Sequence, residues 1–271
     1  MNKTNSRVAL VTGASSGIGK ATANALMTAG YRVFGTSRRA AAETPGRITM
    51  LTCDVTDDES VAKLIERVLA DAGRIDLLVN NAGVGLLGGA EESSTAQAQA
   101  LFDVNVFGVL RLTNAVLPTM RRQSTGRIVN ISSILGLIPS PYNALYAATK
   151  HAVEGYSESL DHELRTLGIR VVLVEPGYTR TSFEESMTRP DRSIAVYQPV
   201  RTTMEKQMRK NVEAGDKPEV VAEAVVKAAT VAVPRRRYTA GKMSGRVSLL
   251  RRFVPESAFD KSLRKQNGLP V

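Results

Sequence analysis

Three glycines after the first apolar run constrain the fold of this chain more than any other feature. Residues 7–11 read RVALV, an expected strand, and are followed by TGASSGIG over residues 12–19 and then by an amphipathic stretch. Gly13, Gly17 and Gly19 permit a tight turn and a close approach of the backbone to a ligand. The helix that follows offers free N–H groups and a positive dipole end to an anion. A tight turn between strand and helix needs glycine in any case, but this placement on the first strand and first helix predicts a dinucleotide site.

Short apolar runs alternate with longer amphipathic stretches along the rest of the chain. The expected strands are residues 7–11, 31–35, 48–52, 75–79, 126–131 and 169–174. The expected helices are residues 18–29, 59–72, 95–117 and 145–167, with a capping box at Thr56 and Glu59 and a further helix after Asp216-Lys-Pro218. Several strands are apolar almost throughout, as parallel strands covered on both faces are. The pattern predicts an α/β fold with one domain over residues 1–271, a doubly wound, Rossmann-like parallel sheet flanked by helices on both faces.

Residues 178–215 interrupt this alternation. They are rich in Thr, Arg, Glu and Met and contain Pro190 and Pro199. A long segment that follows the sixth strand is a candidate lid over a site at the carboxyl edge of the sheet. Its apolar residues favour an apolar pocket; they are Phe183, Met187, Ile194, Val196, Tyr197, Met204 and Met208.

Most of the net charge of +10 lies in the C-terminal extension, residues 235–271. This extension holds ten of the 36 Lys and Arg residues and two of the 26 Asp and Glu residues. A nucleic-acid-binding chain would distribute its basic residues over the fold, so we expect no specific nucleic-acid partner. Val247, Leu250 and Val254 can share a helical face, with Phe253 at its border. Three interpretations of the extension remain open: a cover on the substrate site, a peripheral membrane contact, and a solvated basic surface or partner site.

Cysteine and histidine are too few for several classes of protein. A single cysteine, Cys53, excludes a disulfide framework, and two histidines leave little for a metal site, so no metal is expected. No apolar run approaches the roughly 20 residues that span a bilayer. The first residues, MNKTNSR, are polar and unlike a signal peptide, and we expect a cytoplasmic location.

The residues after the second expected strand distinguish between two dinucleotides. An acidic residue there would bind the adenosine ribose hydroxyls, whereas a basic residue would bind a 2′-phosphate. The sequence reads Gly35-Thr-Ser-Arg-Arg39, with no acid before Glu43. Arg38 is therefore a candidate for a bidentate phosphate contact and favours NADP(H), although a solvated pair of surface arginines remains the alternative.

Tyr146 and Lys150 lie four residues apart at the start of an expected helix, which places them on one helical face. A nearby cation lowers the pKa of a tyrosine, as a proton-transferring tyrosine near neutral pH requires. The spacing alone is weak evidence, since Tyr142 lies four residues upstream of Tyr146. His151 and His162 share the helix away from that face and are expected to be packing or surface residues.

Together these motifs resemble the short-chain dehydrogenases/reductases. The resemblance rests on residues 12–19, Asn80-Asn-Ala-Gly83, Asn105, Ser133, the YxxxK motif at 146–150 and Pro176-Gly177, and it spans about residues 7–185. The sequence of residues 141–160 is most similar to the branch that holds 17β-hydroxysteroid and retinol dehydrogenases.

The resemblance implies roles for four residues in catalysis. Tyr146 would exchange a proton with the substrate oxygen, and Ser133 would hydrogen-bond that oxygen, with Ser132 the weaker candidate. Lys150 would lower the pKa of Tyr146 and hold the nicotinamide ribose, and Asn105 would belong to a proton relay behind it. Hydride transfer belongs to the cofactor, so the protein must supply orientation and a proton.

The resemblance also implies the cofactor contacts. Asp54 would contact the adenine, Thr179 the carboxamide and Thr181 the pyrophosphate, although Asn80, Asn81 and Asp54 could instead stabilise turns. The full expected set is Gly13, Ser15, Ser16, Gly17, Ile18, Gly19, Ser37, Arg38, Asp54, Val55, Asn81, Ala82, Gly83, Tyr146, Lys150, Pro176, Gly177, Thr179 and Thr181.

The expected function is that of an NADP(H)-dependent oxidoreductase that interconverts a carbonyl and an alcohol on a lipophilic substrate, such as a steroid, retinoid or lipid. The alternatives are a reductase of small or β-keto acyl carbonyls and a non-catalytic NADP(H)-sensing or scaffolding protein on the same fold. The family usually pairs the helices at 95–117 and 145–167, which implies a homodimer or homotetramer.

Overall fold

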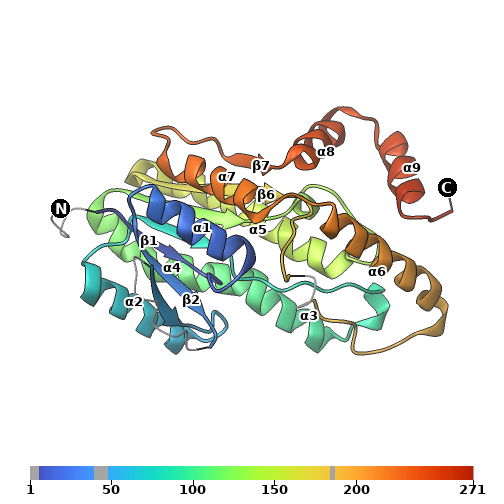
Figure 1. The fold of residues 1–271 in the computed structure, drawn as a ribbon, viewed down its shortest axis with the longest axis horizontal. Coiled ribbons are helices and arrows are strands. Elements are labelled where there is room, and N and C mark those ends of the chain that lie inside the picture. Colours follow the sequence, from blue (N-terminus) through green and yellow to red (C-terminus); the bar gives the residue numbers. More distant parts are fainter. Residues whose placement is uncertain (1–5, 40–47, 184–186, 271) are drawn as a thin grey trace.

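The predicted doubly wound parallel sheet is confirmed. The computed structural model describes residues 6–39, 48–183 and 187–270, and its centre is a sheet of seven parallel strands in the order β3-β2-β1-β4-β5-β6-β7 (Figure 1). The strands are β1 (Val8–Val11), β2 (Arg32–Ser37), β3 (Ile48–Thr52), β4 (Leu77–Asn80), β5 (Gly126–Ile131), β6 (Ile169–Pro176) and β7 (Arg237–Ala240). The strand order reverses between β1 and β4, and this switch point is where ligands bind in such sheets.

Helices cover both faces of the sheet. One face carries α1 (Gly17–Thr28) and α7 (Pro218–Thr230), and the other carries α2 (Asp58–Ala72), α4 (Gly108–Gln123) and α5 (Ala144–Leu164). Alternate residues of each central strand enter opposite cores, with Leu10 on one side of β1 and Val11 on the other. This two-sided burial explains why the strands are apolar nearly throughout.

The helix expected over residues 95–117 is longer than predicted. It runs continuously from α3 (Thr95–Phe102) through a π-helical turn at Asp103–Phe107 into α4, which ends at Gln123. Pro118 does not end it, because the next turn buries Thr119 and Met120 against the sheet. By length and hydropathy this helix could cross a bilayer, contrary to the expectation from the sequence, but it is packed against the sheet.

The last third of the chain is more regular than the sequence indicated. The expected lid at 178–215 contains a 3₁₀ turn (Ala195–Tyr197) and α6 (Gln198–Glu213), while its residues 184–186 lie outside the described residues, as does Glu43. The basic extension is not a simple tail, because it contributes β7 and then α8 (Lys242–Phe253) and α9 (Glu256–Gln266). The sequence pattern did not predict β7, because it is a short edge strand that contains two polar residues, Arg237 and Thr239.

One capping prediction is wrong. The N-cap of α2 is Asp57, whose side chain accepts a hydrogen bond from the Glu59 amide, rather than Thr56. Thr56 instead donates its hydroxyl to Asp54. Pro218 does open α7, as expected, but Lys217 is the N-cap and offers no side-chain cap.

A buried carboxylate joins the end of α5 to the start of β6. Asp161 is fully buried and accepts hydrogen bonds from the Arg170 guanidinium (Nε, 2.8 Å), the Val171 amide (3.0 Å) and Arg165. Burial opposes ionisation of this group, but its hydrogen bonds from Arg170 and Arg165 hold the pKa of Asp161 below its usual value. This side chain therefore fixes the position of α5, the helix that carries Tyr146 and Lys150.

We expect Asp161→Asn to lower the free energy of unfolding at neutral pH by about 3 kcal/mol, because it removes the buried charge that accepts hydrogen bonds from Arg170, Arg165 and the Val171 amide. The loss should shrink as the pH falls, since a carboxylate with a depressed pKa gives stability above its unfolded pKa and loses it as the pH falls through its folded pKa. Urea unfolding followed by circular dichroism measures both effects. Glu59→Gln, which breaks an exposed ion pair with Lys63, is the control and should change stability by no more than about 0.5 kcal/mol. Equal effects in the two variants would contradict this role of Asp161.

Candidate active site

A cavity of about 940 Å³ lies at the carboxyl ends of the strands. It is lined by the segments that follow β1, β2, β3, β4, β5 and β6. Every residue that the sequence assigns to cofactor binding lines this cavity, and so does Ser133, whereas Asn105 does not. His151 and His162 are also absent from the lining, in accord with their expected non-catalytic roles.

The glycine turn after β1 has the shape that a closely bound ligand needs. Gly13 and Gly17 have positive φ angles of 64° and 51°. A Cβ on Gly19 would lie 2.1 Å from the Gly13 carbonyl oxygen, so no larger residue fits there. α1 begins at Gly17 with no side-chain cap from Ser16 and no acid in its first turn, which leaves this helix end suited to a phosphate.

Hydrogen bonds between the ends of β1 and β4 hold this turn in place. The Thr12 hydroxyl accepts from the amides of Asn81 and Ala82, both at 2.9 Å. The Asn81 side-chain amide donates to the carbonyl oxygens of Thr12 (2.9 Å) and Gly13 (3.2 Å). Asn81 thus stabilises the turn as well as lining the cavity, while Asn80 is buried and bonded to Asn130, a purely structural position.

The far end of the cavity combines a cation with an anchored carboxylate. Arg38 is exposed and lines the cavity just after β2. Asp54, after β3, accepts from the amide (2.9 Å) and hydroxyl (2.8 Å) of Thr56, and these hydrogen bonds, with a smaller contribution from the Arg38 charge, lower the pKa of Asp54. Asp54 therefore stabilises its turn, which was the alternative to a cofactor contact. Because it also lines the cavity, it can contact a ligand as well.

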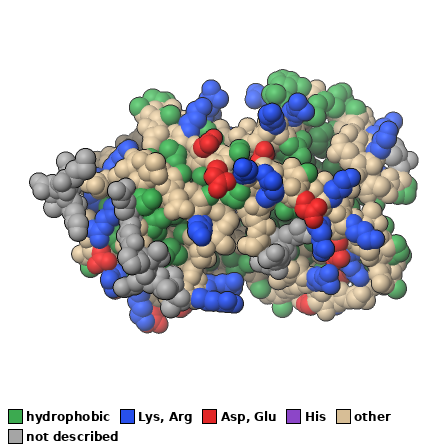
Figure 2. Space-filling model, in the orientation of Figure 1, with side chains coloured by type: hydrophobic (Ala, Val, Ile, Leu, Met, Phe, Trp, Pro, Cys, Tyr) green, Lys and Arg blue, Asp and Glu red, His purple; other side chains and the backbone are tan. Residues whose placement is uncertain are grey.

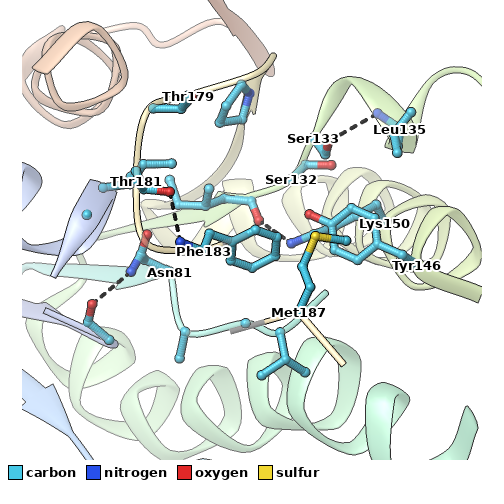
Figure 3. Close-up of a pocket in the computed structure, with 18 of the residues that line it drawn as sticks. Asn81, Ser132, Ser133, Leu135, Tyr146, Lys150, Thr179, Thr181, Phe183 and Met187 are labelled. Atoms are coloured by element: carbon cyan, nitrogen blue, oxygen red, sulfur yellow. Dashed lines mark hydrogen bonds between the residues drawn. The ribbon is translucent and has the colours of Figure 1, made fainter. Parts of the chain in front are cut away.

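Tyr146 and Ser133 face each other across the inner part of the cavity (Figure 3). Ser133 follows β5 and accepts a hydrogen bond from the Leu135 amide at 3.1 Å. Removal from bulk water raises the pKa of Tyr146 to about 12, and its hydrogen bond with Ser133 offsets only part of the rise. At neutral pH Tyr146 therefore holds its proton and can donate it. Tyr142 does not line the cavity and instead packs edge-on against Tyr197.

Lys150 lies behind Tyr146 on the same helix. Its Nζ donates to the Ile131 carbonyl oxygen at 2.9 Å and lies 5.6 Å from the centre of the Tyr146 ring. Burial lowers the pKa of Lys150 to about 8, and the charge of Glu154 opposes that fall. Lys150 is thus mainly an ammonium at neutral pH. The pKa of Tyr146 is nevertheless raised and not lowered as the sequence analysis expected, because burial has the largest effect on it.

Asn105 lies in the π-helical turn, one layer below the cavity surface. Its side chain accepts from the Val84 amide (2.9 Å) and donates to the Val84 carbonyl oxygen (2.9 Å) and the Thr149 hydroxyl (3.2 Å). These bonds connect the loop after β4 to the residue beside Lys150. The relay role implied for Asn105 stays a prediction.

The segment after β6 returns to the glycine turn. Pro176, Gly177, Thr179 and Thr181 all line the cavity, and the Thr181 side chain lies 3.1 Å from where a Cβ on Gly17 would be. The Thr181 hydroxyl accepts a hydrogen bond from the Phe183 amide at 3.2 Å. This contact turns the chain so that Phe183 lies 6.1 Å from Tyr146, ring centre to ring centre (Figure 3).

Apolar side chains surround the space beside Tyr146. Of the apolar residues expected from the lid, Phe183, Met187 and Met208 line the cavity, whereas Ile194, Val196, Tyr197 and Met204 do not. Sequence reasoning also missed apolar lining residues from the loop after β5, from α6 and from the C-terminal helices, among them Leu135, Ile138, Val212, Met243 and Leu263. Val247, noted from the sequence only for its place on a helical face, also lines the cavity. The spacing of Met243 and Val247, one helical turn apart, was the available signal for this wall.

A partly buried charge cluster underlies the site and was not predicted. Arg237 of β7 contacts Glu154 (3.0 Å) and Glu158 of α5, and Glu175 (3.1 Å) of β6. Neither carboxylate oxygen of the buried Glu175 accepts a well-aligned hydrogen bond from the described residues. Burial, with repulsion from Glu154, raises the pKa of Glu175 to about 7. Because Glu154 is one turn beyond Lys150 and Glu175 directly precedes Pro176, this cluster supports two walls of the cavity.

Comparison with known sequences agrees with this geometry. A family model described as short chain dehydrogenase matches residues 7–192. A 3-ketodihydrosphingosine reductase of Bacteroides thetaiotaomicron is 44% identical over 180 residues, which cover 66% of this chain and 66% of that protein. Retinol dehydrogenase 8 of Bos taurus is 38% identical (85% and 81% covered), and 17-beta-hydroxysteroid dehydrogenase type 1 of Homo sapiens is 36% identical (85% and 76%).

Solved structures share the fold over nearly the whole chain. A short-chain dehydrogenase from Streptomyces avermitilis has a TM-score of 0.83 at 33% identity, and the match covers 99% of each chain. A short-chain dehydrogenase/reductase from Burkholderia phymatum in complex with NAD has a TM-score of 0.81 at 28% identity (93% and 95% covered). A serine dehydrogenase complexed with NADP⁺ has a TM-score of 0.74 at 28% identity (86% and 93%). A nicotinamide cofactor is therefore supported, with both forms represented among the similar structures.

We expect Glu175→Gln to raise the free energy of unfolding at about pH 8 by about 1–2 kcal/mol and to change it little near pH 5. A buried carboxyl with a raised pKa keeps its proton in the folded state, so the unmodified protein loses stability as the pH rises from the unfolded value, about 4.3, to about 7. The uncharged amide avoids this loss. Thermal or urea unfolding at several pH values measures the difference. Glu158→Gln, which removes the half-exposed carboxylate on the same guanidinium, is the control and should not gain stability; a gain independent of pH in Glu175→Gln would contradict the explanation.

Proposed function

The chain belongs to the short-chain dehydrogenase/reductase family, in the branch that includes retinol and 17β-hydroxysteroid dehydrogenases, and we propose that it is an NADP(H)-dependent oxidoreductase acting on a lipophilic carbonyl or alcohol. The observation that carries this proposal is the meeting of Ser133, Tyr146 and Lys150 at the inner end of a cavity whose neighbouring wall is apolar. When bound, the nicotinamide ring supplies or accepts the hydride.

The residues of this chain then orient the substrate oxygen and manage its proton. Ser133 and Tyr146 offer two hydroxyls to that oxygen, which fixes the reacting carbon beside the cofactor site. In the reductive direction Tyr146 donates its proton, and its raised pKa ensures that the proton is present at neutral pH. In the oxidative direction Tyr146 must first lose the proton, and the Lys150 ammonium favours the resulting phenolate.

A lipophilic substrate class is supported by two independent observations. The cavity beside Tyr146 is lined by Leu135, Ile138, Phe183 and Met187. The names of the relatives refer to a sphingoid base, retinol and a steroid, which are all lipophilic molecules. Methionine side chains adapt to ligands of different shape, so this wall indicates a class of substrate rather than one compound.

The NADP(H) preference rests on Arg38. Its guanidinium is exposed at the end of β2, beside the cavity, where a dinucleotide bound with its pyrophosphate on the glycine turn would present its adenosine ribose. A 2′-phosphate at that point gains a charge-assisted hydrogen bond that a 2′-hydroxyl cannot match.

We expect Tyr146→Phe to reduce kcat roughly 10²–10⁴-fold, because it removes the proton donor while keeping the ring. Steroid, retinoid, aliphatic and β-keto carbonyls serve as substrates, with NADPH oxidation as the readout and NADPH binding measured by fluorescence. Binding should stay within about threefold of the unmodified protein, as the other expected cofactor contacts around the cavity are kept. Tyr142→Phe, which removes the neighbouring phenol outside the cavity, should leave kcat unchanged. Turnover that survives in Tyr146→Phe would reject the mechanism, and NADPH binding without turnover of any carbonyl would favour a sensing or scaffolding protein.

We expect Arg38→Ser to weaken NADPH binding about 10- to 100-fold, the loss of one charge-assisted hydrogen bond to phosphate. NADH lacks the 2′-phosphate, so its affinity for the same variant should change by less than about threefold and serves as the internal control. Isothermal titration with both dinucleotides measures the two affinities. An equal loss for both, or tighter binding of NADH by the unmodified protein, would overturn the assignment of Arg38.

A further inference from the structure

The helix α8 exposes a row of large apolar side chains. Leu249 is 61% exposed, Leu250 51% and Phe253 73%. Lys242, Arg246, Leu249 and Phe253 follow one another at intervals of three or four residues, which places them on one face of the helix. Such a cluster of exposed apolar side chains on one short helix marks an interaction surface.

Cations accompany this apolar row. α8 contains Lys242, Arg246, Arg251 and Arg252 and no acidic residue. The Arg252 guanidinium lies 5.6 Å from the centre of the Phe253 ring, and Arg251 lies 5.4 Å from that of Phe259 in α9. Figure 2 shows basic and apolar side chains side by side over the upper edge of the molecule, where α8 lies. Glu256 and Asp260 are the acids of the adjoining α9, which also carries Lys261, Arg264 and Lys265.

Another face of α8, next to this row, lines the cavity. Met243 and Val247 line it, and Ser244 is buried. α9 adds Leu263, Gln266 and Asn267 to the same lining. One short helix therefore separates the cavity from the exposed apolar and basic face.

We propose that α8 docks the protein on the surface of an anionic lipid bilayer, with Leu249, Leu250 and Phe253 inserted between the head groups. An interfacial helix of this kind binds through its buried apolar area together with the attraction of Lys and Arg for anionic lipids. The charge of α8 selects this partner, because its basic residues carry no matching acids on the same helix. Docking brings the C-terminal wall of the cavity to the membrane surface, from which a lipophilic molecule can enter without crossing water.

This proposal does not depend on the proposed reaction. The test uses the full-length protein and sedimentation with vesicles of phosphatidylcholine alone or mixed with phosphatidylglycerol. We expect binding to the anionic vesicles, weak binding to the zwitterionic ones, and release at high salt.

The double variant Leu249→Ser/Phe253→Ser should lower partitioning to anionic vesicles at least about tenfold, through the lost apolar area. The matched control is Val196→Ser/Val233→Ser, which removes two apolar side chains that are 75% and 84% exposed elsewhere on the surface, and it should bind as the unmodified protein does. A second variant, Arg246→Gln/Arg252→Gln, keeps the apolar row and should weaken binding roughly fivefold for each cation removed.

Circular dichroism and NADPH binding without vesicles establish that each variant is folded, and neither measurement should change, since none of the substituted residues lines the cavity. Absence of vesicle binding by the unmodified protein overturns the proposal, as does equal binding to both kinds of vesicle. Concentration-dependent self-association that Leu249→Ser/Phe253→Ser abolishes, without vesicle binding, would identify the face as a contact between two copies instead. Each of these results leaves the proposed reaction standing, because carbonyl turnover by the unmodified protein and by Tyr146→Phe tests that reaction separately.

Discussion

The hydrogen bonds that the Thr12 hydroxyl accepts from the amides of Asn81 and Ala82 join the two halves of the sheet at their point of reversal. At this point the crossovers from β1 and β4 leave in opposite directions. The backbone groups at the two strand ends therefore lack the hydrogen-bond partners that neighbouring strands supply elsewhere in the sheet. Thr12 and Asn81 supply those partners. The glycine turn, the start of α1 and the loop after β4 are held in one arrangement as a result, and the cavity takes its shape from it.

Burial shifts the pKa values of Tyr146 and Lys150 in opposite directions. The same poorly hydrated environment raises the pKa of Tyr146 and lowers the pKa of Lys150, because it disfavours a charge of either sign. The two values, about 12 and about 8, still leave an interval that includes neutral pH, in which the phenol is neutral and the amine is charged. A proton donor and a nearby cation therefore coexist at neutral pH, and the charge of Glu154 helps to keep Lys150 protonated.

The sequence predicts the inner part of this molecule better than its outer part. Strands β1 to β6 and the residues at their carboxyl ends follow from apolar runs and turn chemistry, which are local signals, and these residues do meet in one cavity. The cluster of Arg237 with Glu154 and Glu175 could not be predicted, because its members lie far apart in sequence and each resembles an ordinary surface residue. Asn105 was predicted from its motif, but its position below the cavity surface was not. That position depends on the widened π-helical turn, which the sequence pattern does not indicate. The helix ends at Pro118 and Thr56 were misjudged because burial of Met120 and capping by Asp57 outweighed the local pattern.

Because β7 is the last strand of the chain, the order of synthesis affects when the site can be completed. Arg237 is the guanidinium that pairs with Glu154 and Glu175, and it lies beyond every residue of the glycine turn, the tyrosine helix and the segment after β6. While a ribosome is still completing the chain, those two glutamates have no such partner, and burial would require them to be protonated or to remain hydrated. The walls of the cavity beside Lys150 and Pro176 can therefore close fully only after the last strand has emerged and joined the edge of the sheet.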